Sequence, residues 1–100
     1  MSQEGQLLDQ KSLQSVIGKN ADWNELAKDC IAFANATGGR LLLGIEDGED
    51  APPAGQQIPT DLPDTIRRKI AERSVNVAVL PDVVTAANGG QYINLAVPRA

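Results

Sequence analysis

In residues 32–48, a helical pattern ends at a glycine pair and a strand pattern begins directly after it. Apolar side chains recur every three or four residues from Trp23 to Ala34, which is the spacing of a helix with one buried face. Gly38 can adopt the left-handed backbone that ends a helix. The apolar run after Gly39 predicts a buried strand over residues 41–46, followed by a turn at Asp47-Gly48. We therefore expect a helix that packs directly on a sheet.

The start of this helix is marked by Asp22 and Glu25, which have the acid-x-x-Glu spacing of a capping box. Upstream, residues 6–13 mix leucines with polar side chains, and we interpret them as a short edge strand.

The second half of the chain begins with a loop at residues 49–59, which contains three prolines and Gly55. Thr60 or Asp61 is expected to cap a second helix. One face of that helix carries the apolar residues Leu62, Ile66 and Ile70.

Alternating valines at residues 75–79 predict a strand, residues 88–90 predict a turn, and alternating apolar residues at 93–97 predict the last strand. The expected order is strand, helix, strand, helix, strand, strand. This order predicts an α+β fold, a two-layer sandwich in which two helices pack on one mixed sheet. Residues 1–100 are expected to form a single domain, the N-terminal part of a longer protein.

The charge balance argues against a strong non-specific grip on nucleic acid, because 13 acidic residues outnumber 9 basic ones and the formal net charge is −4. Any nucleic-acid role must therefore be local. The single cysteine, Cys30, lies in the helical apolar pattern and is expected to be a core residue in a reducing, cytoplasmic setting. No apolar run is long enough to span a membrane, so no membrane partner is expected.

Residues 32–48 carry the motif FANxTGG, an apolar strand, Gly-Ile and an acidic turn, and Glu4, Asp9 and Lys11 keep the spacing Glu-x4-acid-x-Lys upstream. This combination resembles the Schlafen-type AlbA domain family, which is associated with DNA binding in bacterial transcriptional regulators. The chain departs from that pattern at Asp9, where the family usually has Glu, and at Gln10, where it usually has an aromatic or apolar residue. The resemblance implies a DNA-binding domain of a regulator.

Four motif positions, Asn35, Gly38, Gly39 and Gly44, are expected to have a structural role. They would form the turn at the end of the helix and allow close packing of helix on strand, with direct ligand contact as the alternative.

Some Schlafen relatives are RNA endonucleases, and transfer of their carboxylate trio by motif position implies Glu4, Asp9 and Asp47 as catalytic and metal-binding residues. Such a trio could hold magnesium or manganese, which prefer oxygen ligands. The alternative interpretation is structural, since Asp47 suits a turn before glycine and Asp9 suits a solvated strand. The sequence favours a binding module without cofactor over an enzyme.

A basic helix face is the candidate nucleic-acid surface. The residues expected to contact phosphates are Arg67, Arg68, Lys69 and Arg73, together with Lys11 and Arg40. The alternative for the helix is a solvated face. Few aromatic residues are present for stacking on single strands, which favours contact with a DNA backbone.

Other chemistries find no support in the sequence, because the absence of histidine excludes a Ser-His-Asp triad and a lone cysteine cannot build a zinc site. A further alternative is a protein-interaction or homodimerisation module that pairs through an edge strand or the terminal hairpin.

Overall fold

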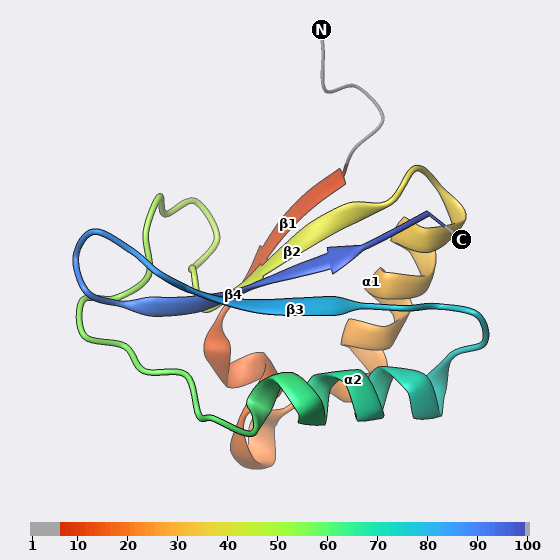
Figure 1. Cartoon of the computed structure of the whole chain (residues 1–100), viewed down its shortest axis with the longest axis horizontal. Helices are drawn as coiled ribbons and strands as arrows, with labels where there is room; N and C mark the ends of the chain where they lie inside the picture. Colours follow the sequence, from red (N-terminus) through yellow and green to blue (C-terminus); the bar gives the residue numbers. More distant parts are fainter. Residues whose placement is uncertain (1–6, 100) are drawn as a thin grey trace, which may run out of the picture.

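The computed structural model describes residues 7–99, in which two α-helices accompany a four-stranded sheet (Figure 1). The elements follow one another as β1 (Leu7–Lys11), the short 3₁₀ helices η1 (Leu13–Val16) and η2 (Gly18–Asn20), α1 (Trp23–Asn35), β2 (Gly39–Leu43), α2 (Leu62–Arg73), β3 (Leu80–Thr85) and β4 (Gln91–Val97). The predicted α+β fold and element order are confirmed.

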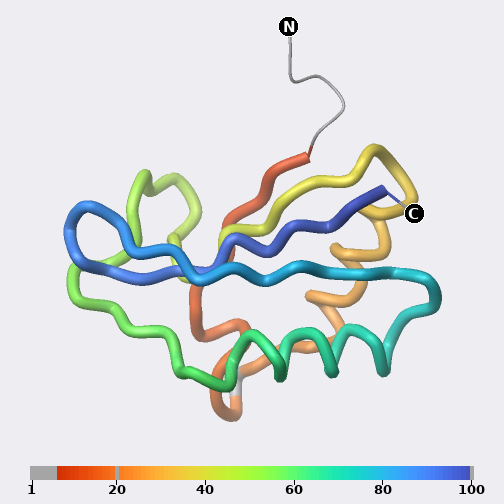
Figure 2. Tube along the Cα trace, viewed as in Figure 1, coloured from red at the N-terminus to blue at the C-terminus, as the bar shows by residue number. Residues whose placement is uncertain are grey.

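The sheet is mixed, with the strand order β1-β2-β4-β3. β1 and β2 run parallel, joined by the crossover that contains α1, whereas β4 runs antiparallel to both β2 and β3. The trace in Figure 2 shows that β4, the last strand in the sequence, lies between β2 and β3.

The core lies between the two helices and one face of the sheet. Alternate residues of β2 and β4 point into this layer, because successive side chains of a strand leave opposite faces. They meet apolar residues of α1 and α2, and all of the following are buried: Leu26, Cys30, Leu41, Leu43, Ile66, Ile70, Ile93, Leu95 and Val97. Within residues 7–99, no helix has the length and apolar character needed to cross a membrane.

α1 begins as the capping pattern predicts, since Asp22 Oδ1 accepts a hydrogen bond from the Glu25 amide at 3.1 Å. In a full capping box the Asp22 amide would donate to the Glu25 side chain. Here it donates to the Ser15 carbonyl, which links the start of the helix to η1. At the other end, the Gly38 amide donates to the Phe33 carbonyl at 2.8 Å, and Gly38 has a φ of +80°. This is a left-handed helix end of the expected kind.

β2 ends earlier than the sequence suggests, at Leu43 instead of residue 46. The reason is Gly44, whose φ of +113° turns the chain out of the strand. Asp61, one of the two residues expected to cap the second helix, does occupy the N-cap position of α2, but its side chain makes no capping hydrogen bond.

The strand predicted from Val75, Val77 and Val79 is wrong. These residues connect α2 to β3, and Asn76 in their midst has a φ of +62°, which breaks an extended run. Val79 and Val77 still pack at the core, whereas Val75 is 83% exposed. The true strand, β3, lies at the edge of the sheet, where Pro81 is tolerated.

Candidate nucleic-acid interface

α2 separates apolar from basic side chains. Leu62, Ile66 and Ile70 recur at four-residue spacing and are buried against the core. Arg68 lies about half a turn from Ile66 and Ile70, so it leaves the helix on the solvent side and is exposed.

Two of the basic side chains on α2 are held by neighbours. Arg67 pairs with Asp64 one turn earlier. Arg73 contacts Glu72 at 3.3 Å, and its Nε donates to Asn24 Oδ1 at 2.9 Å, which ties the end of α2 to the start of α1. Arg68 and Lys69 have no carboxylate within ion-pair distance among residues 7–99.

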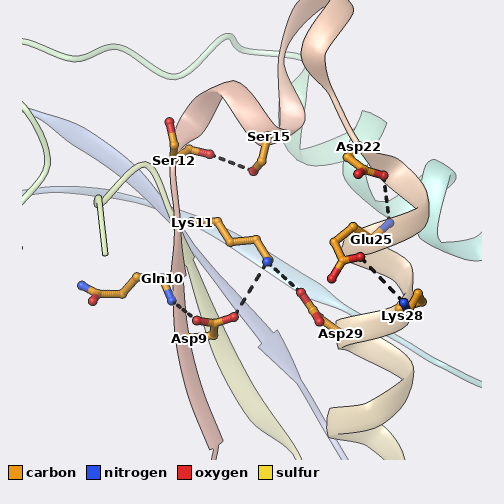
Figure 3. A network of polar contacts seen from close by, with 9 residues as sticks. All are labelled: Asp9, Gln10, Lys11, Ser12, Ser15, Asp22, Glu25, Lys28 and Asp29. Atoms are coloured by element: carbon orange, nitrogen blue, oxygen red, sulfur yellow. Dashed lines mark hydrogen bonds and ion pairs between the residues drawn. The ribbon is translucent and has the colours of Figure 1, made fainter. Parts of the chain in front are cut away.

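Lys11 lies on the helix side of β1, where it joins the strand to α1 (Figure 3). Its Nζ is 2.8 Å from Asp29 Oδ2 and 3.8 Å from Asp9 Oδ2. Burial alone would lower the pKa of Lys11, but the contact with Asp29 and the charges of Asp29, Asp9 and Glu25 outweigh it, and the pKa is raised. Lys11 therefore stays protonated and connects β1 to α1 through its positive charge.

The Lys11–Asp29 contact is close without being aligned as a hydrogen bond, so Asp29 Oδ2 is a buried oxygen that lacks a hydrogen-bond donor among the described residues. We regard the contact as an ion pair, because the separation is short and neither side chain is more than 25% exposed.

Arg40 lies on the other face of the sheet. It alternates with the buried Gly39 and Leu41, so its side chain points away from both helices. The six basic residues expected to contact phosphates are thus distributed over α2, the β1–α1 junction and the helix-free face of the sheet. The structure does not bring them together on one surface.

The carboxylate trio includes Glu4, which lies outside the described residues. Asp9 lies on the helix side of β1, where its Oδ1 accepts from the Gln10 amide at 2.9 Å. Asp47 is exposed in the turn after β2. Within residues 7–99, no group of three or more His, Cys, Asp and Glu side chains is placed to hold a metal ion.

The glycine motif has a packing role in the structure. A Cβ on Gly38 would lie 2.9 Å from the Val97 carbonyl oxygen and 3.0 Å from the Arg99 amide, and one on Gly39 would lie 2.5 Å from the Leu7 carbonyl oxygen. One on Gly44 would lie 2.8 Å from Gln56 Nε2. Asn35 is the exposed last residue of α1.

The same turn forms one side of a shallow hollow of about 240 Å³, lined by residues 37–40 and 96–99, which include Arg40 and Arg99. Arg99 was not among the predicted phosphate contacts. Its place beside Arg40 depends on the β2–β4 pairing, for which the sequence carries no local signal.

Glutamines hold the loops at the opposite end of the sheet, a role that the sequence did not indicate. Gln10 donates to the Glu49 carbonyl at 2.8 Å and accepts from the Gly48 amide at 3.2 Å, which fastens the acidic turn to β1. Gln56 donates to the carbonyls of Gly44 and Gln91. Since Gln10 and Asp9 leave β1 on opposite faces, the acidic turn is anchored from the side opposite to Asp9.

The comparison with protein families gives a match over residues 4–100 to the family described as Schlafen, AlbA_2. No curated protein matches the chain closely enough to count as a relative.

Proposed function

Because this chain belongs to the Schlafen AlbA_2 family, we propose that it is a nucleic-acid-binding domain. The observation that carries the proposal is a pair of consecutive cations on α2, the exposed Arg68 and the partly exposed Lys69, neither of which has a carboxylate partner among residues 7–99. Unpaired cations on a helix surface are the groups that phosphates attract.

We propose further that the target is DNA, that contact is made with the backbone of a duplex, and that the domain serves a regulatory protein of the cytoplasm. Aromatic side chains support backbone contact over base stacking: Trp23 and Phe33 pack against the core, and Tyr92 is half-buried in the sheet. Stacking on single strands would need exposed aromatic faces.

The net charge of −4 limits how many phosphates the domain can neutralise. Arg67 and Arg73 already hold Asp64 and Glu72, and Lys11 holds Asp29. If Arg68 and Lys69 each neutralise one phosphate, the logarithm of the binding constant should fall against the logarithm of salt concentration with a slope of about −2.

The test is fluorescence anisotropy of labelled duplex DNA, single-stranded DNA and structured RNA at low and moderate salt. We compare Arg68→Glu/Lys69→Glu with Lys19→Glu/Lys28→Glu, which changes the net charge by the same amount at exposed positions outside α2. The α2 variant should lose affinity by about tenfold or more, because each change replaces a phosphate contact by a repulsive charge. Circular dichroism of both variants checks that they fold.

Equal losses of affinity in the two variants would show that binding depends only on net charge. That result would contradict the proposal that α2 contacts the nucleic acid. No binding of the unmodified chain to any of the three ligands at low salt would overturn the nucleic-acid function itself.

A further inference from the structure

The face of the sheet opposite the helices carries two rows of side chains that cross all four strands, and Val84 and Tyr92 continue this face on β3 and β4 alone. The strand register places Leu8, Arg40, Ala96 and Leu80 in one row and Gln10, Leu42, Asn94 and Asp82 in the next. Residues directly opposite each other on paired strands point to the same side, so these eight residues form one surface, which we call the open face. Neither helix covers it, because both pack on the buried layer of Leu41 and Leu95 (Figure 1).

Large apolar side chains lie at both ends of the first row. Leu8 is 58% exposed and Leu80 is 57% exposed, whereas Ala96 in the same row and Leu42 in the next row are half-buried. Single exposed leucines are common on monomers, but apolar side chains grouped on one sheet face indicate a surface that is covered by a partner.

The polar residues of the open face are complementary to one another but too far apart to meet within one chain. Arg40 on β2 and Asp82 on β3 are separated by β4 and lie in different rows. Neither makes an ion pair with another of the described residues. Asn94, directly opposite Asp82, has a buried Oδ1 that lacks a hydrogen-bond donor in the described part of the chain.

We propose that the open face binds a second copy of this chain in a two-fold symmetric dimer. A two-fold axis that crosses β4 midway between Arg40 and Asp82 brings Arg40 against the partner's Asp82, and by symmetry brings Asp82 against the partner's Arg40. The planar guanidinium carries five N–H donors and can make two parallel hydrogen bonds to the partner's carboxylate. The apolar side chains around these two pairs are then covered by the same contact.

The edges of the sheet are less suited to pairing between copies. β3 contains Pro81, which has no amide hydrogen to donate to a neighbouring strand. The acidic turn held by Gln10 lies at the β1 end of the open face, so the contact is centred on β4. This dimer does not depend on the proposed nucleic-acid function, since none of its residues belongs to α2.

The test uses Arg40→Asp and Asp82→Arg, with molar mass measured by sedimentation velocity over a wide range of protein concentration. The unmodified chain should dimerise. Each variant alone should weaken dimerisation by about tenfold or more, because it places like charges opposite each other twice.

Mixing the variants is the sharper arm of the test. A 1:1 mixture of Arg40→Asp and Asp82→Arg should form a heterodimer, since both acidic side chains of the first variant then face arginines of the second. A chain that carries both substitutions should dimerise again, because the two charges are exchanged and remain complementary. Lys28→Asp, on the exposed side of α1, should leave dimerisation unchanged.

The proposal is overturned if the unmodified chain stays monomeric up to its solubility limit, if either variant dimerises as tightly as the unmodified chain, or if the mixture of variants remains monomeric. Circular dichroism confirms that each variant folds. Both substitutions lie at exposed positions, so their effect on stability is expected to be small.

Discussion

Cys30 shows at the scale of one residue how burial controls chemistry. It is fully buried on α1, and its pKa is raised to about 12, first by burial and then by the charge of Asp29, with Lys11 opposing. Since the thiolate is the reactive form, a thiol that ionises only near that pH is expected to be inert at neutral pH. The sequence supported a core role, and the structure confirms it.

The raised pKa predicts a loss of stability in alkaline solution. In the unfolded chain the thiol ionises near 9.0, whereas the folded state keeps its proton to about 12. This stabilisation is complete below pH 9 and declines as the pH rises toward 12. The free energy of unfolding, measured by urea denaturation, should therefore fall by about 1 kcal/mol between about pH 9 and pH 10.

Cys30→Ala is the control for this decline. It should be less stable at neutral pH because it leaves a small cavity, but its stability should change little over the same pH interval. The comparison ends at about pH 10 because Lys11 begins to contribute above its ordinary value of 10.5. A variant that declines as steeply as the unmodified chain would contradict this role for the thiol.

Gly38 is the second position where a single residue decides the local structure. Alanine there would combine an unfavourable positive φ with a contact of 2.9 Å to the Val97 carbonyl oxygen, which belongs to the backbone and cannot move cheaply. We expect Gly38→Ala to lower the free energy of unfolding by about 2 kcal/mol or more.

Gly55→Ala is a matched control, since Gly55 has a similar φ of +77° and nothing lies within 4 Å of the added Cβ. Its cost should be about 1 kcal/mol, from the backbone conformation alone. Chemical denaturation of both variants separates the cost of the positive φ from the cost of the close contact. Equal costs would show that the contact with the last strand contributes nothing.

At the scale of elements, β1 depends on α1 for more than its crossover connection. Lys11 and Asp29 form an ion pair between strand and helix that is mostly shielded from water. Lys11→Met should lower the free energy of unfolding by about 2 kcal/mol, because it leaves the Asp29 carboxylate half-buried without a cation.

A double-mutant cycle with Asp29→Asn measures this pair directly. The double variant should cost about 1 kcal/mol less than the sum of the single variants. The same cycle on Lys28 and Glu25, an exposed pair at 3.8 Å, should give a coupling energy close to zero. Additive effects at Lys11 and Asp29 would mean that the contact contributes no stability of its own.

The elements themselves were largely predictable, since capping and hydrophobic spacing are local signals. Asp22, Leu26 and Cys30 mark α1 without reference to the rest of the chain. The misplaced strand at residues 75–79 shows the limit of such signals. Its valines alternate correctly, but whether Asn76 takes a positive φ depends on how the chain must turn from α2 back to the sheet.

At the scale of the whole molecule, the charged residues could be counted from the sequence, but their ion-pair partners could not be predicted from it. Lys11 meets a carboxylate 18 positions away, and Arg73 meets the side chain of Asn24, 49 positions away. These contacts decide which cations remain for a ligand, and they depend on the fold. The sequence therefore predicted six basic candidates, whereas Arg68, Lys69 and Arg40 are the ones that have no carboxylate partner among residues 7–99.

The position of β4 has a consequence for how the protein is made. β4 is the last of these four strands to leave the ribosome, yet it lies between β2 and β3 in the sheet. β3 and β4 are close in sequence and can form a hairpin quickly, whereas β2 must wait about fifty residues for its antiparallel partner. During translation, β2 therefore has β1 on one side but lacks its other neighbouring strand until residues 91–97 have been synthesised.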